Sequence, residues 1–289
     1  MKKRNCFLLG VAGAYALYQA YELNNFVCEN HYVKVLNVNE PIRISVLADI
    51  HEKEYGRNNE RLIAALKDIR PDVIAIPGDI ICTKKYPRPL SYDKLIYVKK
   101  LMHQLGLIAP VLFSPGNHER RLNIYQKPSY DMLKEIFAEE GITVLENETK
   151  IHEIKGTRIA FTGADICLGA YKKAWKRQKM PKGYLNRILP RPTEDAYNIL
   201  LAHAPGFFDQ YSEWGADLVL SGHNHGCLVR LPKVGAIVGP DLSLFPKYDS
   251  GYFEKDGSKM FISRGLGTHT FNIRVFDSAE ILTVNLHGE

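Results

Sequence analysis

The sequence has few cysteines, no low-complexity segment and no surplus of charge outside one stretch. The cysteines are scattered and include no CxxC pair, which excludes a disulfide scaffold and a thiolate zinc finger. They are Cys6, Cys28, Cys82, Cys167 and Cys227. Over 289 residues, 45% are hydrophobic and 24% charged, which excludes a disordered or collagen-like chain. This length suits one large domain or two small ones.

The positive charge of the chain is concentrated in one segment. The formal net charge is +6, yet eight basic residues and no acidic residue lie within 171–191. Without them the chain has 30 basic against 32 acidic residues, so nucleic-acid binding is not the favoured function. The surrounding stretch, 165–195, is expected to be a basic, cap-like insertion. It either contacts a membrane surface or an anionic substrate, or forms a solvated loop.

The amino terminus has the pattern of a membrane anchor. The cationic stretch Met1–Arg4 precedes the uncharged, mostly apolar residues Cys6–Ala20. This run is shorter than the roughly 20 residues of a comfortable spanning helix. A signal peptide cleaved near residues 14–16 and an amphipathic or buried terminal helix are the alternatives. An uncleaved anchor over 1–21 is favoured, since basic residues precede the run and acidic ones follow it; this polarity predicts that the remaining chain lies outside the cytoplasm.

Beyond a polar connector over 22–40, strands and helices alternate within one predicted domain, 41–289. Strands are expected at 42–48, 73–76 and 111–113, and helices at 58–69, 91–105 and 130–140. Short apolar strands that alternate with helices indicate a largely parallel, buried sheet. Further strands are expected at 157–161, 197–202 and 217–220, with a hairpin at 252–262. This order predicts two packed sheets flanked by helices.

Residue types that bind metals follow nearly every predicted strand. Open α/β sheets bind ligands at the carboxyl ends of their strands, so these side chains are expected to converge. They are Asp49, His51, Asp79, Asn117, His203, His223 and His225. Oxygen and imidazole ligands without thiolates suit Zn, Mn or Fe. The set is large enough for two divalent ions roughly 3.5–4 Å apart, and His118 is left over for acid–base work.

Taken singly, these residues have ordinary explanations. Asp79 is explained equally well as a turn or helix cap, and His203 as a core histidine with satisfied hydrogen bonds. His223 and His225 are more specific, because two histidines two residues apart on an extended chain reach the same metal. The ordinary explanations fail jointly, since five separate loops would all have to carry ligand-type residues at strand ends by accident.

Five motifs, in this order, resemble those of the calcineurin-like metallophosphoesterase superfamily. They are Asp49-x-His51, Gly78-Asp79, Gly116-Asn117-His118-Glu119, His203-x-Pro205 and Gly222-His223-x-His225. The segment 263–267 and the anchor-like start are similar to a bacterial membrane-associated branch of that superfamily. The resemblance implies an α/β fold, namely a four-layer αββα sandwich of two mixed β-sheets flanked by helices, with a dinuclear metal centre.

The resemblance also implies a role for each residue. One ion would be held by Asp49, His51, Asp79 and His225, and the other by Asp79, Asn117, His203 and His223. His118 would not be a ligand but the proton donor to the leaving oxygen, or an electrostatic partner of the phosphoryl group. Cys82 stands where the family often has an aspartate, which affects the tuning of the metals rather than their binding. Arg264 is a candidate for binding phosphate, with a surface ion pair as the alternative.

The implied activity is hydrolysis of a phosphate ester, phosphodiester or pyrophosphate by in-line attack of a hydroxide that bridges two divalent ions. The membrane-associated branch implies a lipid-linked or cell-envelope substrate. A nuclease of the same superfamily is the first alternative. The basic segment 171–191 supports a nuclease, whereas the anchor-like amino terminus, which predicts a location outside the cytoplasm, opposes it. A non-catalytic scaffold is the second alternative. It predicts erosion of the ligand positions, and all seven are present.

Overall fold

The structure is a computed structural model. It describes every residue except 1, 37, 173–175, 177, 228, 232–233, 240–242, 269–271 and 289, and it leaves out the side chains of residues 2–9 and 229. Parts of the predicted anchor and of the predicted basic insertion therefore lie outside the described residues.

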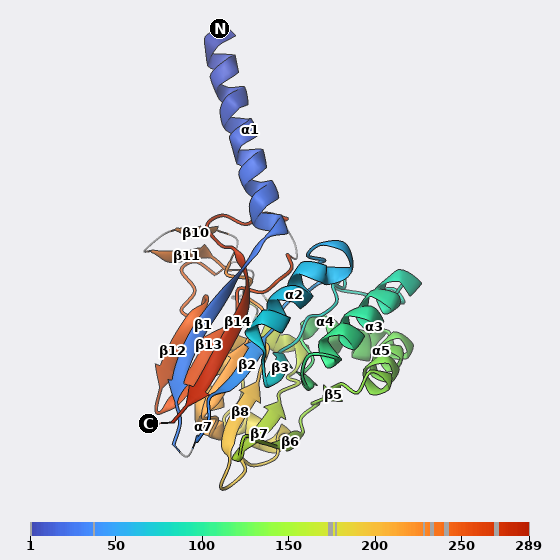
Figure 1. The fold of residues 1–289 in the computed structure, drawn as a ribbon, viewed down its shortest axis with the longest axis vertical. Coiled ribbons are helices and arrows are strands. Elements are labelled where there is room, and N and C mark those ends of the chain that lie inside the picture. The colour runs from blue at the N-terminus through green and yellow to red at the C-terminus, as the bar shows by residue number, and fades with distance from the viewer. Residues whose placement is uncertain are drawn as a thin grey trace.

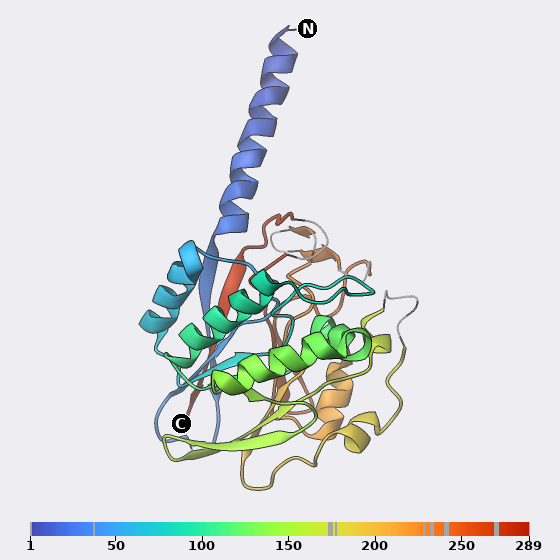
Figure 2. The same ribbon diagram turned by 90° about the vertical axis from the view of Figure 1, so that its right-hand side faces the viewer.

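Two six-stranded sheets pack face to face (Figures 1 and 2). The strand order of the first is β1-β14-β2-β3-β4-β5, and β2 to β5 run parallel. Its strands are β1 Phe26–Lys34, β2 Ile42–Val46, β3 Val73–Ile76, β4 Val111–Phe113, β5 Thr143–Val144 and β14 Ala279–His287. The order of the second is β12-β13-β9-β8-β7-β6. Its strands are β6 Thr149–Ile154, β7 Thr157–Gly163, β8 Tyr197–Leu201, β9 Leu218–Ser221, β12 Gly251–Lys255 and β13 Ser258–Ile262. A separate hairpin pairs β10 Val229–Leu231 with β11 Gly235–Val238.

Helices cover the outer face of each sheet. The first sheet packs against α2 Glu60–Ile69, α3 Tyr92–Gly106, α4 Asn117–Tyr125 and α5 Lys127–Glu139. The second packs against α6 Tyr184–Ile188 and α7 Phe208–Trp214. Short 3-10 helices lie at η1 Arg57–Asn59, η2 Leu168–Tyr171 and η4 Pro205–Phe207. These layers confirm the predicted αββα sandwich.

The pleat of the strands divides the core into three parts. In β3, Ile74 and Ile76 face the outer helices, while Val73 and Ala75 face the second sheet. Alternate side chains of a strand point to opposite faces, so a strand covered on both sides is apolar at every position. All four residues of β3 are buried, as the apolar run at 73–76 predicts.

The sequence prediction missed several elements, among them β1 and α4. Strand β1 lies within the predicted connector and pairs in parallel with β14 at the edge of the first sheet. The sequence of β1 is too polar to predict a buried strand. As an edge strand, β1 has one side open to solvent, where polar residues are tolerated. Helix α4 begins at Asn117, where no helix was predicted. The predicted helices at 58–69, 91–105 and 130–140 correspond to α2, α3 and α5 with shifted ends.

Helix α1, Lys2–Asn24, projects from the body of the protein (Figures 1 and 2). Its base is fixed by buried hydrogen bonds: Gln19 Nε2 donates to the Arg274 carbonyl at 2.8 Å, and the Arg274 N–H donates to Gln19 Oε1 at 3.1 Å. Ser278 Oγ donates to Glu22 at 2.8 Å. Within the part of the chain that the structure describes, no helix combines the length and the apolar character needed to cross a bilayer.

Candidate metal centre

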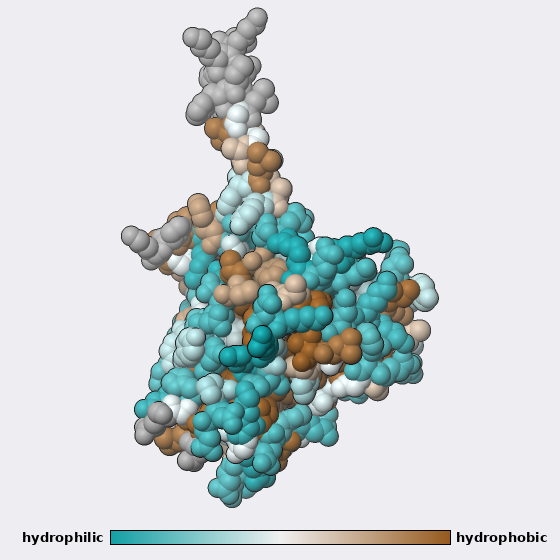
Figure 3. Space-filling model, viewed as in Figure 1, coloured by the Kyte–Doolittle hydropathy of each residue, from teal (hydrophilic) through white to brown (hydrophobic). Residues whose placement is uncertain are grey.

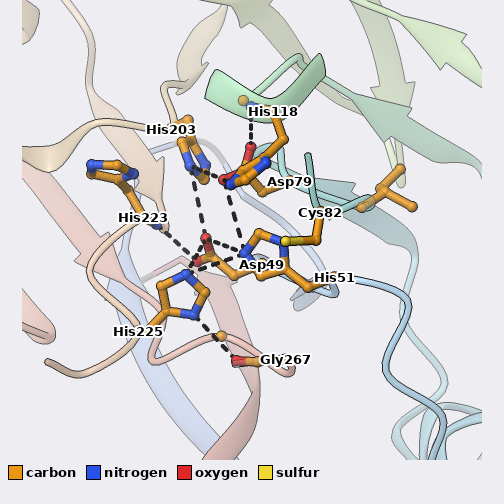
Figure 4. A network of polar contacts seen from close by, with 12 residues as sticks. Asp49, His51, Asp79, Cys82, His118, His203, His223, His225 and Gly267 are labelled. Carbon is orange, nitrogen blue, oxygen red and sulfur yellow. Dashed lines mark hydrogen bonds and ion pairs between the residues drawn. The ribbon is translucent and has the colours of Figure 1, made fainter. Parts of the chain in front are cut away.

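Aspartate and histidine side chains converge at the carboxyl ends of the central strands (Figure 4). Asp49 and His51 follow β2, Asp79 follows β3, and Asn117 follows β4. His203 follows β8, and His223 and His225 follow β9, so both sheets contribute. We call this set the central cluster: Asp49, His51, Asp79, Asn117, His203, His223 and His225.

Potential ligand atoms of the central cluster form two adjacent groups. Atoms of Asp49, His51 and His225 lie within 4.8 Å of one another, and so do those of Asp79, His203 and His223. Asp49 Oδ1 is 3.4 Å from His225 Nε2, and Asp79 Oδ2 is 3.0 Å from His203 Nε2. Asp79 Oδ2 is also 4.0 Å from His51 Nε2, which places this carboxylate between the groups. The two groups contain six of the seven ligands that the resemblance implies, and the assignment of ligands to two ions stays a prediction.

Several buried polar atoms of the central cluster have no hydrogen-bond partner. They are Asp49 Oδ1, Asn117 Oδ1 and His203 Nε2. A buried polar atom without a partner is destabilising by about 1–3 kcal/mol, so such atoms are rare without a cause. All three are oxygens or an imidazole nitrogen of residues that follow the central strands, and Asp49 Oδ1 lies 3.7 Å from His203 Nε2. This donor set fits divalent cations.

The hydrogen bonds of three histidines direct the same nitrogen, Nε2, toward the cluster, where Nε2 of His51 and Nε2 of His225 lie 3.2 Å apart. Nδ1 of each ring lies within hydrogen-bond distance of a backbone carbonyl: His51 with Ile81 at 3.2 Å, His203 with Pro77 at 2.7 Å, and His225 with Gly267 at 3.1 Å. A carbonyl only accepts, so Nδ1 carries the proton of the neutral ring, and Nε2 is the atom that can bind a metal. A backbone carbonyl that fixes the tautomer in this way is typical of metal-binding histidines.

His118 has the opposite arrangement. Its Nδ1 accepts the backbone N–H of Thr83 at 2.6 Å. The proton of the neutral ring therefore sits on Nε2, which lies 3.8 Å from Asp79 Oδ2. A protonated Nε2 offers no lone pair to a metal, but it can donate a proton or a hydrogen bond into the site. The direction of this hydrogen bond thus distinguishes His118 from His51, His203 and His225.

The cluster is electrostatically coupled. Burial lowers the pKa of His203, but the Asp79 and Asp49 carboxylates outweigh burial and raise that pKa to about 9. Burial raises the pKa of Asp79, but His203 and His118 outweigh it and hold that pKa well below its ordinary value. Burial and the neighbouring His203 lower the pKa of His223 well below its usual range. Cations bound here would displace the proton that His203 holds, because a metal and a proton compete for Nε2.

The backbone of the central cluster is strained and tightly packed. Five of its members, none of them glycine, have φ between 48° and 72°: Asp49, His51, Asp79, His223 and His225. Such left-handed conformations persist only where the surroundings enforce them, and they concentrate at functional sites. A Cβ on Gly116 would lie 2.2 Å from Asp79 Oδ1, and one on Gly222 would lie 2.5 Å from Asp49 Oδ2. These glycines allow the loops to approach the carboxylates, as the sequence suggested.

Glu119 supports the cluster in a role that the sequence did not reveal. Its buried carboxylate accepts the backbone N–H groups of Asp79 at 3.0 Å, Ile80 at 2.9 Å, Ile81 at 3.3 Å and Gly116 at 3.0 Å. One side chain therefore fixes the loops that follow β3 and β4. The position of Glu119 in the Gly-Asn-His-Glu motif is the sequence feature that could have indicated this supporting role.

A buried arginine supports the loop behind His225. Arg274 donates to the carbonyls of Gly265 at 3.0 Å and Gly267 at 2.8 Å, and the Gly267 carbonyl also pairs with His225 Nδ1. On the other side of the cluster, the Tyr171 ring lies 5.1 Å from the ring of His223. Neither residue stood out in the sequence, because their contacts come from distant segments.

Two predicted positions lie outside the two ligand groups. Arg264 forms ion pairs with Glu280 at 2.6 Å and with Glu29 at 3.0 Å, and neither carboxylate belongs to the central cluster. Its role in phosphate binding stays a prediction. Cys82 Sγ lies beside His51 and His118, within 4.8 Å of their ring nitrogens. Burial, reinforced by Glu52, raises the pKa of this thiol to about 11.

Comparisons with known proteins agree with this geometry. A family model described as calcineurin-like phosphoesterase matches residues 42–227. The uncharacterized metallophosphoesterase YkoQ of Bacillus subtilis is 26% identical over 247 residues, which cover 85% of this chain and 84% of the relative. The phosphodiesterase YaeI of Escherichia coli is 24% identical, with 85% and 82% covered. The UDP-2,3-diacylglucosamine pyrophosphatase LpxG of Chlamydia muridarum is 22% identical, with 83% and 82% covered.

Proposed function

The chain belongs to the calcineurin-like phosphoesterase family and is a metal-dependent phosphoester hydrolase, and from this premise we propose that its central cluster holds two divalent ions for phosphodiester or pyrophosphate hydrolysis. Mn, Fe and Zn are the candidates, since the two groups offer only oxygen and imidazole donors. Asp49, His51 and His225 would hold one ion. Asn117, His203 and His223 would hold the other, with Asp79 shared between them.

This proposal rests on a contrast between the histidines. Nδ1 of His51, His203 and His225 lies against a backbone carbonyl, whereas Nδ1 of His118 accepts a backbone N–H. Two bound ions would activate water and neutralise charge on the phosphoryl oxygens. The chain supplies the remaining chemistry: the Thr83 N–H fixes His118 with its proton on Nε2. That proton is then available to the departing oxygen, which would otherwise leave as an unstable alkoxide. Carbonyls behind His51, His203 and His225 keep those three rings in the ligand tautomer.

We further propose that the natural substrate is a lipid-linked or cell-envelope phosphate compound. LpxG, named as a pyrophosphatase of a diacylated nucleotide sugar, supports this substrate class, although it is a distant relative. A pyrophosphate offers the same scissile P–O bond and the same developing charge as a diester, so one site serves both.

Hydrolysis of bis(p-nitrophenyl) phosphate tests the proposed chemistry. We expect turnover by the full chain with manganese, loss of turnover after chelation, and recovery when Mn, Fe or Zn is returned. A phosphomonoester, a lipid-linked pyrophosphate and single-stranded DNA complete the panel. Cleavage of DNA alone would favour the nuclease alternative. Absence of hydrolysis for every compound with every metal would contradict the proposal and favour a scaffold.

We also propose that α1 attaches the protein to a lipid surface. Residues 10–21 expose apolar and aromatic side chains, including Leu17 at 75% and Tyr21 at 64% (Figure 3). Such side chains favour the interface between lipid and water. We expect the full chain to float with lipid vesicles, and Leu17→Glu to weaken flotation more than the control Leu107→Glu, whose leucine is also 75% exposed. Equal flotation of both variants would contradict attachment through this helix.

A further inference from the structure

A cavity of about 580 Å³ adjoins the metal centre on the side of His223. His223 and its neighbour Asn224 form the wall that the cavity shares with the central cluster. The opposite walls come from the basic insertion, from the η4–α7 segment and from residues 243–248. A substrate whose phosphorus lies at the central cluster therefore has room for one of its ester arms in this cavity.

The residues that line the cavity carry more positive than negative charge. Lys172, Lys179 and Lys247 line it from separate segments of the chain. Its single lining carboxylate among the described residues, Asp209, is held by Lys255 at 2.8 Å. Within the described part of the chain, Lys172 and Lys179 have no carboxylate within salt-bridge distance. A cavity with an excess of lysines favours an anion, and lysine binds phosphate as a point charge.

The lining of the cavity is also partly apolar. Met180, Phe207 and Tyr248 line the cavity together with the lysines. Asn224 Nδ2 donates to the Tyr248 carbonyl, so the loop that carries His223 and His225 is tied directly to this wall. The Tyr248 ring lies under Lys247, with Nζ at 4.6 Å from the ring centroid. This lining suits an apolar or ring-containing arm that ends in a charged group.

We propose that this cavity is a second anion subsite, which binds a further phosphate on the non-leaving arm of the substrate. The inference rests on the proposed function, because the scissile phosphate must lie at the central cluster. It narrows the substrate class to phosphodiesters or pyrophosphates with an additional phosphate beyond a short apolar spacer. Lys179 and Lys247 attract that phosphate, while Phe207 and Tyr248 pack against the spacer.

Two chromogenic diesters test the subsite. Both carry one p-nitrophenyl group, and the other arm is a hexyl chain that ends in a hydroxyl in one probe and in a phosphate in the other. We expect the full chain to prefer the phosphorylated probe by about tenfold in kcat/KM, the effect of about 1.4 kcal/mol. In Lys179→Ala/Lys247→Ala, this preference should largely disappear, mainly through a higher KM for the phosphorylated probe.

A matched control removes the same charge elsewhere. Lys67→Ala/Lys150→Ala alters two exposed lysines outside the cavity and should keep the preference within about twofold at constant ionic strength. The subsite is contradicted if the cavity variant keeps the preference, or if the control loses it equally, since long-range attraction would then explain it.

Calorimetry separates this inference from the proposed function. If neither probe is hydrolysed, the proposed function fails, yet binding of the phosphorylated probe still reports on the cavity. Binding that weakens about tenfold in the lysine variant but not in the control supports the subsite. Equal binding by all three proteins overturns it.

Discussion

Asp79→Asn is expected to remove nearly all hydrolytic activity together with bound metal. The carboxylate lies between the two ligand groups and is buried, with Oδ2 at 3.0 Å from His203 Nε2. An amide is neutral, so both ions would lose the negative charge of the ligand that they are proposed to share. Loss of about 4 kcal/mol of charge stabilisation in the transition state corresponds to about a thousandfold lower kcat. Steady-state kinetics and metal analysis of the same preparations measure the two effects.

Asp68→Asn is the matched control for Asp79→Asn. Asp68 lies on the exposed surface of α2, and its substitution also replaces a carboxylate by an amide. We expect this variant to retain both metal and turnover. A fully metal-loaded and active Asp79→Asn protein would contradict a shared carboxylate between the two ions.

His118→Ala is expected to lower kcat while the metal content stays unchanged. Its Nδ1 accepts the Thr83 N–H, so its Nε2 proton is the one offered to the leaving oxygen. General acid catalysis contributes about 10²–10⁴-fold. The loss should be larger for an alkyl leaving group than for p-nitrophenolate, because the more basic oxygen needs the proton more.

The dependence on the leaving group distinguishes proton donation from a structural effect. His103→Ala is the control, since His103 is an exposed histidine that pairs with Glu140 at 2.9 Å, on the outer helices. It should leave both rates unchanged. Equal losses for both leaving groups in His118→Ala would exclude proton donation, and loss of metal would instead make His118 a ligand.

The sequence was sufficient to predict the layers of the fold and the convergence of the central cluster. Buried parallel strands are apolar at every position, as in 73–76, and parallel strands present their carboxyl ends on one edge. The first property is visible in the local sequence, and the second follows from the topology of a parallel sheet. The ligand-type residues after these strands therefore predict a shared site from the sequence alone.

Other features depend on contacts between distant segments and could not be predicted. The Nδ1 partner of His118 is a backbone group 35 residues away, and only the folded chain reveals which nitrogen is protonated. The sequence left open whether Arg264 binds phosphate or forms an ion pair, and it could not reveal that Glu29, 235 residues away, and Glu280 bind its guanidinium. Strand β1 escaped notice for the same reason: it exists because β14, at the other end of the chain, pairs with it.

Metal stoichiometry of the purified full chain tests the central claim most directly. Elemental analysis by mass spectrometry, after dialysis against metal-free buffer, counts the Mn, Fe and Zn bound to each chain. We predict two ions per chain in the native protein and a clear deficit in His203→Ala, which removes one of the orphaned nitrogens. Fewer than one ion per native chain, or an unchanged content in His203→Ala, would contradict a dinuclear centre at this site.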